Sequence, residues 1–278
     1  MDWEKVKNIM IVMLLLTNMF LLGFAYLNSP GYTMSGEQYD AIMTVLQKSG
    51  VTLDAPLLKV SPPMPALELY AGALNPGDIC GAFLKDGFTD AGDGVYMSGG
   101  AEVMVTGGGF VYNNPNGSGA GNSCDGIMKS LSAELPGFVL DKSDTSLSGN
   151  PVDNTVTYRQ VYRGYMIYSN YVVFTVSNSG IIRAECSYNP PAFFDKARGG
   201  ICSPDVAAFA FLRRAKALYN GDKINISKMD LLYCVPQPAA GADNQDQAPG
   251  LTAVPYYRFG VSGKADNVLV NAYTCAVQ

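Results

Sequence analysis

Residues 9–27, IMIVMLLLTNMFLLGFAYL, decide the architecture of this chain. This apolar run of about 19 residues would be roughly 28 Å long as a helix, which is enough to cross the hydrocarbon core of a bilayer. The sequence that follows is polar and globular in character, and it contains all the cysteines. We therefore expect one N-terminal transmembrane helix that carries a folded region.

Basic residues predict how this helix is oriented. Lys5 and Lys7 precede the apolar run, and the next basic residue after it is Lys48. The positive-inside rule then places residues 1–8 in the cytoplasm and the bulk of the chain outside, in a single pass through the cell membrane.

A cleaved signal peptide is the competing interpretation, because Gly23-Phe24-Ala25 has the small-x-small form of a cleavage site. The apolar run is longer than a usual signal core, and Asp2 and Glu4 lie in the segment before it, which favours a retained anchor. Both interpretations place the rest of the chain outside the cytoplasm.

Composition narrows the classes of function. The chain has 278 residues, a net charge of −5 and no histidine. No basic patch suggests a nucleic-acid partner. Without histidine, Ser-His-Asp and Cys-His catalysis and His-ligated metal sites are excluded, and no Gly-x-Ser-x-Gly or Ser-x-x-Lys motif occurs. We therefore expect no enzyme activity, no metal and no cofactor.

The six cysteines all follow the apolar run. An even number in an oxidising compartment favours disulfides, and no Cys-x-x-Cys motif suggests redox catalysis or zinc. We expect Cys186 to pair with Cys202 and Cys234 with Cys275, and Cys80 and Cys124 are further candidates for disulfides. The alternative is that some of the six are buried free thiols.

Three helices are predicted after the anchor. The first starts at Ser35, which forms a capping box with Gln38 and precedes an apolar stripe. The second runs from about Ser123 to Leu135. The third has Ser203 at its N-cap and proline at its first position, and it ends at Asn220-Gly221.

Short runs rich in Val, Tyr, Thr and Ile, separated by turn residues, predict antiparallel strands between these helices. The runs lie at 67–70, 81–84, 95–98, 101–106, 110–112, 155–162, 166–168, 171–176, 181–188, 224–235, 253–261 and 267–275. Gly99-Gly100 predicts a tight hairpin. The pattern indicates an α+β fold of repeated helix-plus-antiparallel-sheet units, with extracytoplasmic subdomains at 28–147 and 148–278.

The N-terminus has a more specific pattern, which comprises Met1-Asp2-Trp3-x-Lys5-x-Lys7-x-Ile9 and then Asn18-x-Phe20-Leu21-Leu22. This stretch resembles the YycI family, the membrane-anchored accessory proteins of the YycFG (WalRK) two-component system. The close match covers about 25 residues. The end of the chain, from Pro255 to Tyr273, also looks like the end of a PepSY-type or YycH/YycI-type domain. The six cysteines and the Gly/Ala-rich loops depart from the family pattern.

The resemblance implies regulation without catalysis. YycI-like proteins act with a sister protein, YycH, on a sensor histidine kinase, through transmembrane and extracytoplasmic contacts. Asp2, Trp3, Lys5 and Lys7 would then form the anchor motif.

Leu14, Asn18 and Leu22 lie along one face of the predicted anchor at i, i+4 spacing. The functional interpretation is that Asn18 hydrogen-bonds to a partner helix within the membrane. The alternative is that Asn18 lies near the outer headgroups and is hydrated, or bonds to its own backbone. The resemblance favours the partner contact.

Two rival functions differ from a signalling accessory. One is a PepSY-like binding or protease-inhibitory module outside the cell, based on the C-terminal half alone. The other is an extracytoplasmic enzyme, which the missing histidine and motifs argue against.

Overall fold

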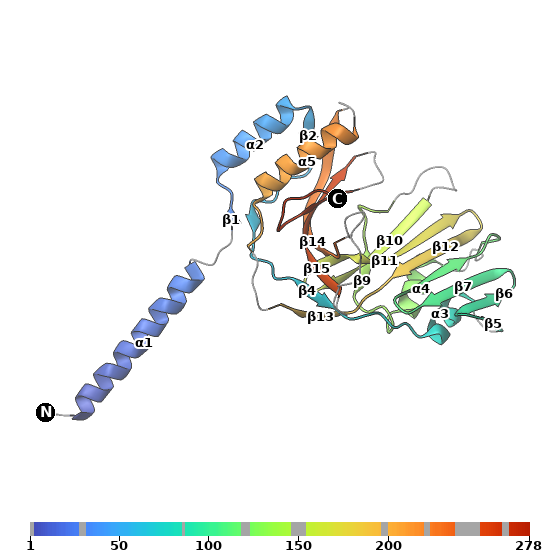
Figure 1. The fold of residues 1–278 in the computed structure, drawn as a ribbon, viewed down its shortest axis with the longest axis horizontal. Coiled ribbons are helices and arrows are strands. Elements are labelled where there is room, and N and C mark those ends of the chain that lie inside the picture. Colours follow the sequence, from blue (N-terminus) through green and yellow to red (C-terminus); the bar gives the residue numbers. More distant parts are fainter. Residues whose placement is uncertain are drawn as a thin grey trace, which may run out of the picture.

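The computed structural model describes residues 3–27, 32–84, 87–117, 123–145, 154–195, 200–219, 223–236, 251–262 and 267–278. Helix α1 (Trp3–Leu27) projects away from the body, which is formed by the rest of the chain (Figure 1). The fold of the body is α+β, as the sequence predicts. Most of its strands join one extended 14-stranded sheet, and β1 (Tyr32–Thr33) pairs separately with β3 (Val60–Ser61).

One half of the extended sheet is an antiparallel array that we call the first lobe. Its strand order is β5-β6-β7-β8-β12-β11-β10-β9, and helices α3 and α4 pack against it (Figure 1). The bounds are α3 (Pro76–Phe83), β5 (Thr89–Gly92), β6 (Val95–Ser98), β7 (Ala101–Thr106), β8 (Gly109–Asn113), α4 (Cys124–Ser130), β9 (Phe138–Leu140), β10 (Asn154–Tyr162), β11 (Tyr165–Ser177) and β12 (Gly180–Ser187).

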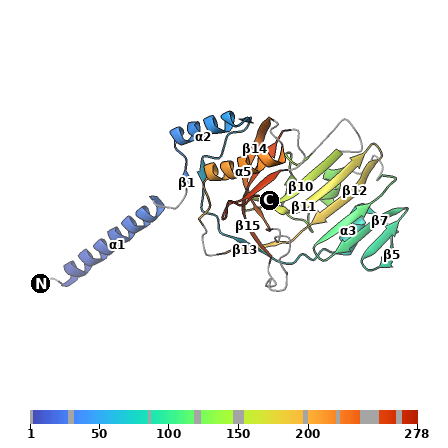
Figure 2. The same ribbon diagram turned by 45° about the horizontal axis from the view of Figure 1, so that its top comes forward.

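The other half, which we call the second lobe, combines strands from both ends of the body. Its strands β14 and β15 pair antiparallel and are flanked by β2, β16 and the β4-β13 pair. Helices α2 and α5 cover one face (Figures 1 and 2). The bounds are α2 (Gly36–Lys48), β2 (Val51–Leu53), β4 (Leu67–Leu69), β13 (Pro191–Phe194), α5 (Pro204–Leu218), β14 (Ile224–Cys234), β15 (Leu251–Val261) and β16 (Val268–Asn271).

Aromatic side chains stack within the core of each lobe. In the first lobe Phe83 of α3 stacks on Tyr112 of β8, with ring centroids 4.6 Å apart. In the second lobe Phe211 of α5 stacks on Phe259 of β15 at the same separation. The predicted boundary between residues 147 and 148 lies outside the described residues. The second core unites α2 and β2, from early in the chain, with strands from its end.

The helix caps follow the sequence signals. Ser35 forms the predicted capping box with Gln38 at the start of α2. Ser203 occupies the N-cap of α5, and Pro204 is its first residue. The predicted glycine hairpin joins β6 to β7, because Gly99 and Gly100 both adopt positive φ.

The strand predicted at 81–84 is wrong, because this stretch ends helix α3. The side chain of Asn75 accepts a hydrogen bond from the backbone of Gly77, and Pro76 occupies the first turn. Ile79, Cys80 and Phe83 then bury one face of the helix. A run of four apolar residues does not distinguish a strand from the end of a helix.

Candidate functional site

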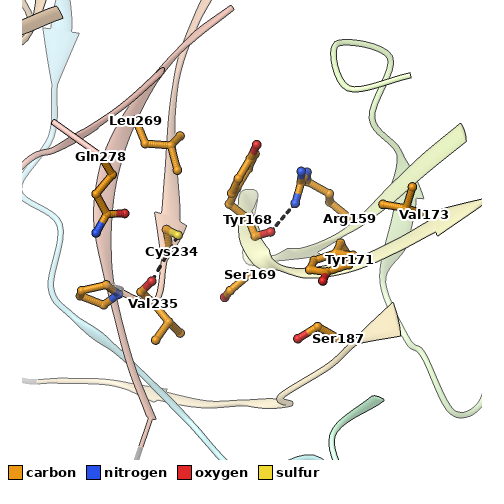
Figure 3. Close-up of a pocket in the computed structure, with 11 residues that line it drawn as sticks. Arg159, Tyr168, Ser169, Tyr171, Val173, Ser187, Cys234, Val235, Leu269 and Gln278 are labelled. Atoms are coloured by element: carbon orange, nitrogen blue, oxygen red, sulfur yellow. Dashed lines mark hydrogen bonds between the residues drawn. The ribbon is translucent and has the colours of Figure 1, made fainter. Parts of the chain in front are cut away.

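The two lobes meet where β11 and β14 pair in parallel through Ile167 and Tyr233. A pocket of about 480 Å³ opens beside this junction (Figure 3). It is lined from both lobes, by Arg159, Tyr168, Ser169, Tyr171, Val173 and Ser187 on one side and Cys234, Val235, Pro236, Leu269 and Gln278 on the other.

An irregularity in β11 shapes one wall of the pocket. Arg159 of β10 is opposite Tyr171, but the next residue, Gln160, is opposite Ile167. Residues 168–170 therefore bulge out of the ladder, and bulges of this kind turn side chains towards functional sites. The buried hydroxyl Oγ of Ser169 has no hydrogen-bond partner in the described structure.

Hydrogen bonds hold the bulge at residues 168–170 in place. Asn170 is fully buried, and its amide donates to the side chain of Gln160 at 2.8 Å and to the backbone oxygen of Asn189 at 2.7 Å. Arg159 donates to the backbone oxygen of Tyr168 and lies over the ring of that residue, 3.5 Å from its centroid. This wall is therefore built before any ligand arrives.

A charged cluster that includes the pocket residue Arg159 links the lobes. We call it the junction network, and it comprises Asp141, Asp144, Arg159, Lys228, Asp230 and Arg258. Arg258 of β15 is completely buried and forms ion pairs with Asp141 at 2.5 Å and with Asp230 at 2.6 Å. Because acidic and basic members balance, the network presents no net charge to a ligand.

Electrostatics fix the ionisation of this network. Burial alone would raise the pKa of Asp141, but hydrogen bonds from Arg258 and Ser143 and the charges of Arg258 and Lys228 outweigh it and hold the pKa below its usual value. Burial would lower the pKa of Arg258, and its bonds to Asp230 and Asp141 raise it instead. Both ions therefore stay charged at neutral pH.

The pocket suits a neutral amphipathic group. Its cation, Arg159, is already paired with Asp144 through its Nε at 3.0 Å. What remains are two tyrosine rings, aliphatic side chains and the polar groups of Ser169, Ser187 and Gln278. Among the residues that the structure describes, no group of three His, Cys, Asp or Glu side chains is arranged to hold a metal ion.

The predicted anchor face lies on α1. Leu14 is 64% exposed, and Asn18 one turn later is also exposed. The hydroxyl of the neighbouring Thr17 bonds back to the oxygen of Met13 at 2.8 Å, so it is satisfied within the helix. The side chain of Leu22 is outside the described part of the chain.

The predicted anchor motif is visible only in part. Trp3 is 78% exposed at the start of α1, and Lys7 is also exposed. Asp2 and the side chain of Lys5 are outside the described residues. Among the helices of the described ranges, none combines the length and apolar character that a membrane crossing requires. The span at 9–27 therefore stays a prediction.

The predicted disulfide pairs are not formed, because all six cysteines are free thiols. Cys186 lies on β12 inside the first core, whereas Cys202 packs against the second. Cys234 ends β14 beside the pocket, and Cys275 lies in a turn after β16. Cys80 is buried in α3, and Cys124 begins α4. The disulfide prediction rests on loops and strand order, and these do not show which hydrophobic core each cysteine enters.

Sequence reasoning also missed most of the pocket. The tyrosines of β10 and β11 occupy different environments, and two of them, Tyr168 and Tyr171, line the pocket. Tyr158 is buried in the first core. The junction network gives no signal in the sequence, because its members come from four separate stretches, at Asp141–Asp144, Arg159, Lys228–Asp230 and Arg258.

Comparisons with known proteins identify no family. No family model matches the chain, and no curated protein matches it. The solved structures that it resembles include an uncharacterized protein from Eubacterium rectale, at 12% identity over 77% of this chain and 86% of that one, with a TM-score of 0.45.

The C-terminal domain of YpeB from Bacillus megaterium is 13% identical over 74% of this chain and 98% of that one, with a TM-score of 0.38. YycH from Bacillus subtilis is 12% identical over 84% of this chain and 61% of that one, with a TM-score of 0.46. At these scores the likenesses define neither the fold nor the function of this chain.

Proposed function

We propose that this chain is a non-catalytic accessory protein, anchored in the cell membrane by α1, that regulates a sensor histidine kinase of a cell-envelope two-component system. A YycH-like protein would be its second partner. The resemblance of the N-terminal motif to the YycI family supplies these partners, and the contacts would come from α1 and from the extracytoplasmic body.

The exposure of α1 is the observation that carries the proposal. Large apolar side chains are exposed on all sides of the helix, including Met10, Ile11, Val12, Met13, Leu14, Leu15, Leu16, Met19, Phe20 and Leu21. Burying one such side chain stabilises by about 1.5–3 kcal/mol, and a whole domain is stable by only about 5–15 kcal/mol. A helix of this kind therefore needs lipid or another apolar surface around it.

Asn18 supports a helical partner within that apolar surface. It is exposed on α1 one turn after Leu14, so both side chains would face the same neighbour. An amide in hydrocarbon gains about 0.6–2 kcal/mol from a hydrogen bond across helices. The body would then stand outside the cell, because Lys5 and Lys7 lie before the apolar run.

A crosslinking pull-down tests the proposal. It uses the full-length protein in its own membrane, beside a copy in which an unrelated transmembrane helix replaces residues 9–27. We expect the native chain to recover a sensor kinase or a YycH-like protein and the replaced copy to lose it. Recovery of neither by a correctly inserted native chain would contradict the proposal.

A second candidate is an extracytoplasmic PepSY-like binding or protease-inhibitory module. The preformed pocket between the lobes favours it, since about 480 Å³ is within the usual range for ligand sites. Thermal-shift screening with neutral di- and tripeptides, with Ser187→Trp as a variant that fills the pocket, tests this candidate. Stabilisation of the native chain alone would favour it, and no shift with any peptide would count against it.

A further inference from the structure

Cys202 and Cys275 lie side by side although the chain between them is about 70 residues long. The thiol of Cys275 is close enough to that of Cys202 to raise its pKa. Cys202 precedes α5, and Cys275 lies in the turn that follows β16. Both are partly exposed, unlike the buried thiols of Cys80, Cys186 and Cys234.

Hydrogen bonds fix the backbone on the Cys202 side. Its N–H donates to the backbone oxygen of Ala272 at 2.7 Å. Its own backbone oxygen accepts from the hydroxyl of Tyr257, a buried residue of β15, also at 2.7 Å. Cys202 is therefore tied directly to the segment that leads into Cys275.

The turn at Asn271–Ala276, which we call the C-terminal turn, is equally well defined. The side-chain oxygen of Asn271 accepts from the N–H groups of Tyr273 at 2.9 Å and Thr274 at 3.1 Å. The backbone oxygen of Asn271 accepts from Cys275 at 2.8 Å. Cys275 itself has a φ of +55°. Residues other than glycine rarely adopt this left-handed backbone conformation unless their surroundings hold them in it.

We propose that Cys202 and Cys275 are a disulfide-forming pair that fastens the C-terminal turn to the start of α5. A disulfide-class oxidant, such as oxidised glutathione or a thiol–disulfide oxidoreductase, supplies the chemistry. The first thiolate attacks the oxidant and expels one reduced thiol, and the second thiolate then displaces the other. In total the two thiols give two protons and two electrons to the oxidant, and one S–S bond forms between them.

Cys202 suits the second of these steps. Burial raises the pKa of its thiol to about 12, with further contributions from the hydrogen bond and charge of Cys275. Its thiolate is therefore scarce at neutral pH, which makes Cys202 a poor first attacker. The mixed disulfide on Cys275 would then be resolved by the adjacent sulfur of Cys202.

The bond would also affect the pocket between the lobes. The residues after the C-terminal turn run back along β16, where the N–H of Gln278 donates to the oxygen of Leu269 at 2.9 Å. Leu269 and Gln278 both line the pocket. Fastening the turn therefore fixes one wall of the pocket, whatever partner the membrane helix contacts.

Peptide mapping without reduction tests the pair in the purified full-length chain in detergent. After exposure to oxidised glutathione, we expect trypsin to release one linked species, residues 199–213 joined to 265–278. Titratable thiols in the denatured chain should fall from six to four. Cys124→Ser, which removes another partly exposed cysteine, should leave the link intact.

Cys202→Ser and Cys275→Ser should each abolish this linked species. The proposal would be overturned if the native chain kept all its thiols, carried glutathione at these positions, or linked either cysteine to a different one. The readout does not depend on the kinase, so it fails or succeeds separately from the proposed function.

Discussion

Charged residues at the junction connect the two lobes through ion pairs. Asp141 and Arg258 are 117 positions apart in the sequence and nevertheless form a buried ion pair. No local sequence pattern predicts such a pair, because Asp141 follows β9 and Arg258 lies within β15. This explains why the sequence predicts the strands of the junction but not its polar network.

Removing one partner of this buried pair should destabilise the protein strongly. Arg258→Met removes the fully buried cation that pairs with both Asp141 and Asp230, and loss of one partner of a buried pair costs about 3–5 kcal/mol. Urea unfolding of the full chain in detergent measures the loss. The matched control is Arg183→Met, since Arg183 is 49% exposed and pairs with Glu185 on the surface. It should cost less than about 1 kcal/mol, and equal losses would contradict this account of the network.

The ionisation of Asp141 predicts a response to acid. Its folded-state pKa lies below the unfolded value of about 3.9. The resulting stabilisation is complete above about pH 4 and is lost as the pH falls through the folded-state pKa. Asp141→Asn should therefore be less stable at pH 7 and should have a flatter stability profile below about pH 4. Parallel profiles for the two proteins, measured by urea unfolding across pH, would refute this.

At the scale of elements, helices with caps were predicted and a helix with a weaker signal was missed. Ser35 with Gln38 and Ser203 with Pro204 mark α2 and α5 in the sequence and in the structure. Helix α3 has the same kind of start at Asn75, but it is short and its last residues are apolar throughout. Cap chemistry was therefore a better guide than the apolar run.

The face of α1 that bears Asn18 should control association and not insertion. Asn18→Leu replaces the amide with an apolar side chain of similar size, so insertion should be retained. Affinity for the membrane partner should fall about 3- to 30-fold, as expected for a lost interhelical hydrogen bond. Co-purification yield, normalised to the amount of inserted protein, provides the measurement. An unchanged yield would show that Asn18 is not part of the contact with the partner.

Oxidation should stabilise the second lobe through the C-terminal turn. A disulfide across a long loop contributes about 2–4 kcal/mol, which would raise the Tm by roughly 5–15 °C in a protein of this size. Thermal unfolding of oxidised and reduced chain measures the difference, and Cys275→Ser should abolish it. Equal Tm values for the fully linked and reduced forms would show that the disulfide does not stabilise the second lobe.

For the whole molecule, the α+β class was predictable and the assembly of its lobes was not. Strand alternation and helix periodicity are local, so they identify the elements. The second core forms only when α2 and β2 meet strands from the end of the chain, and β2 pairs with β14 in parallel. Contacts of this kind depend on long-range packing. The pocket between the lobes could not be predicted for the same reason, because residues of both lobes line it.

The central claim is that α1 holds the body at a membrane and contacts a signalling partner there. Photo-crosslinking from single positions of α1 in the native membrane tests it most directly. Probes at Leu14 and Asn18 report on the proposed contact face, and probes at Leu16 and Phe20 report on another face of the same helix. We predict that a sensor kinase or a YycH-like protein is captured from the first two positions and much less from the second two. Equal capture from all four positions, or capture of lipid alone by a chain that is correctly inserted, would contradict the account.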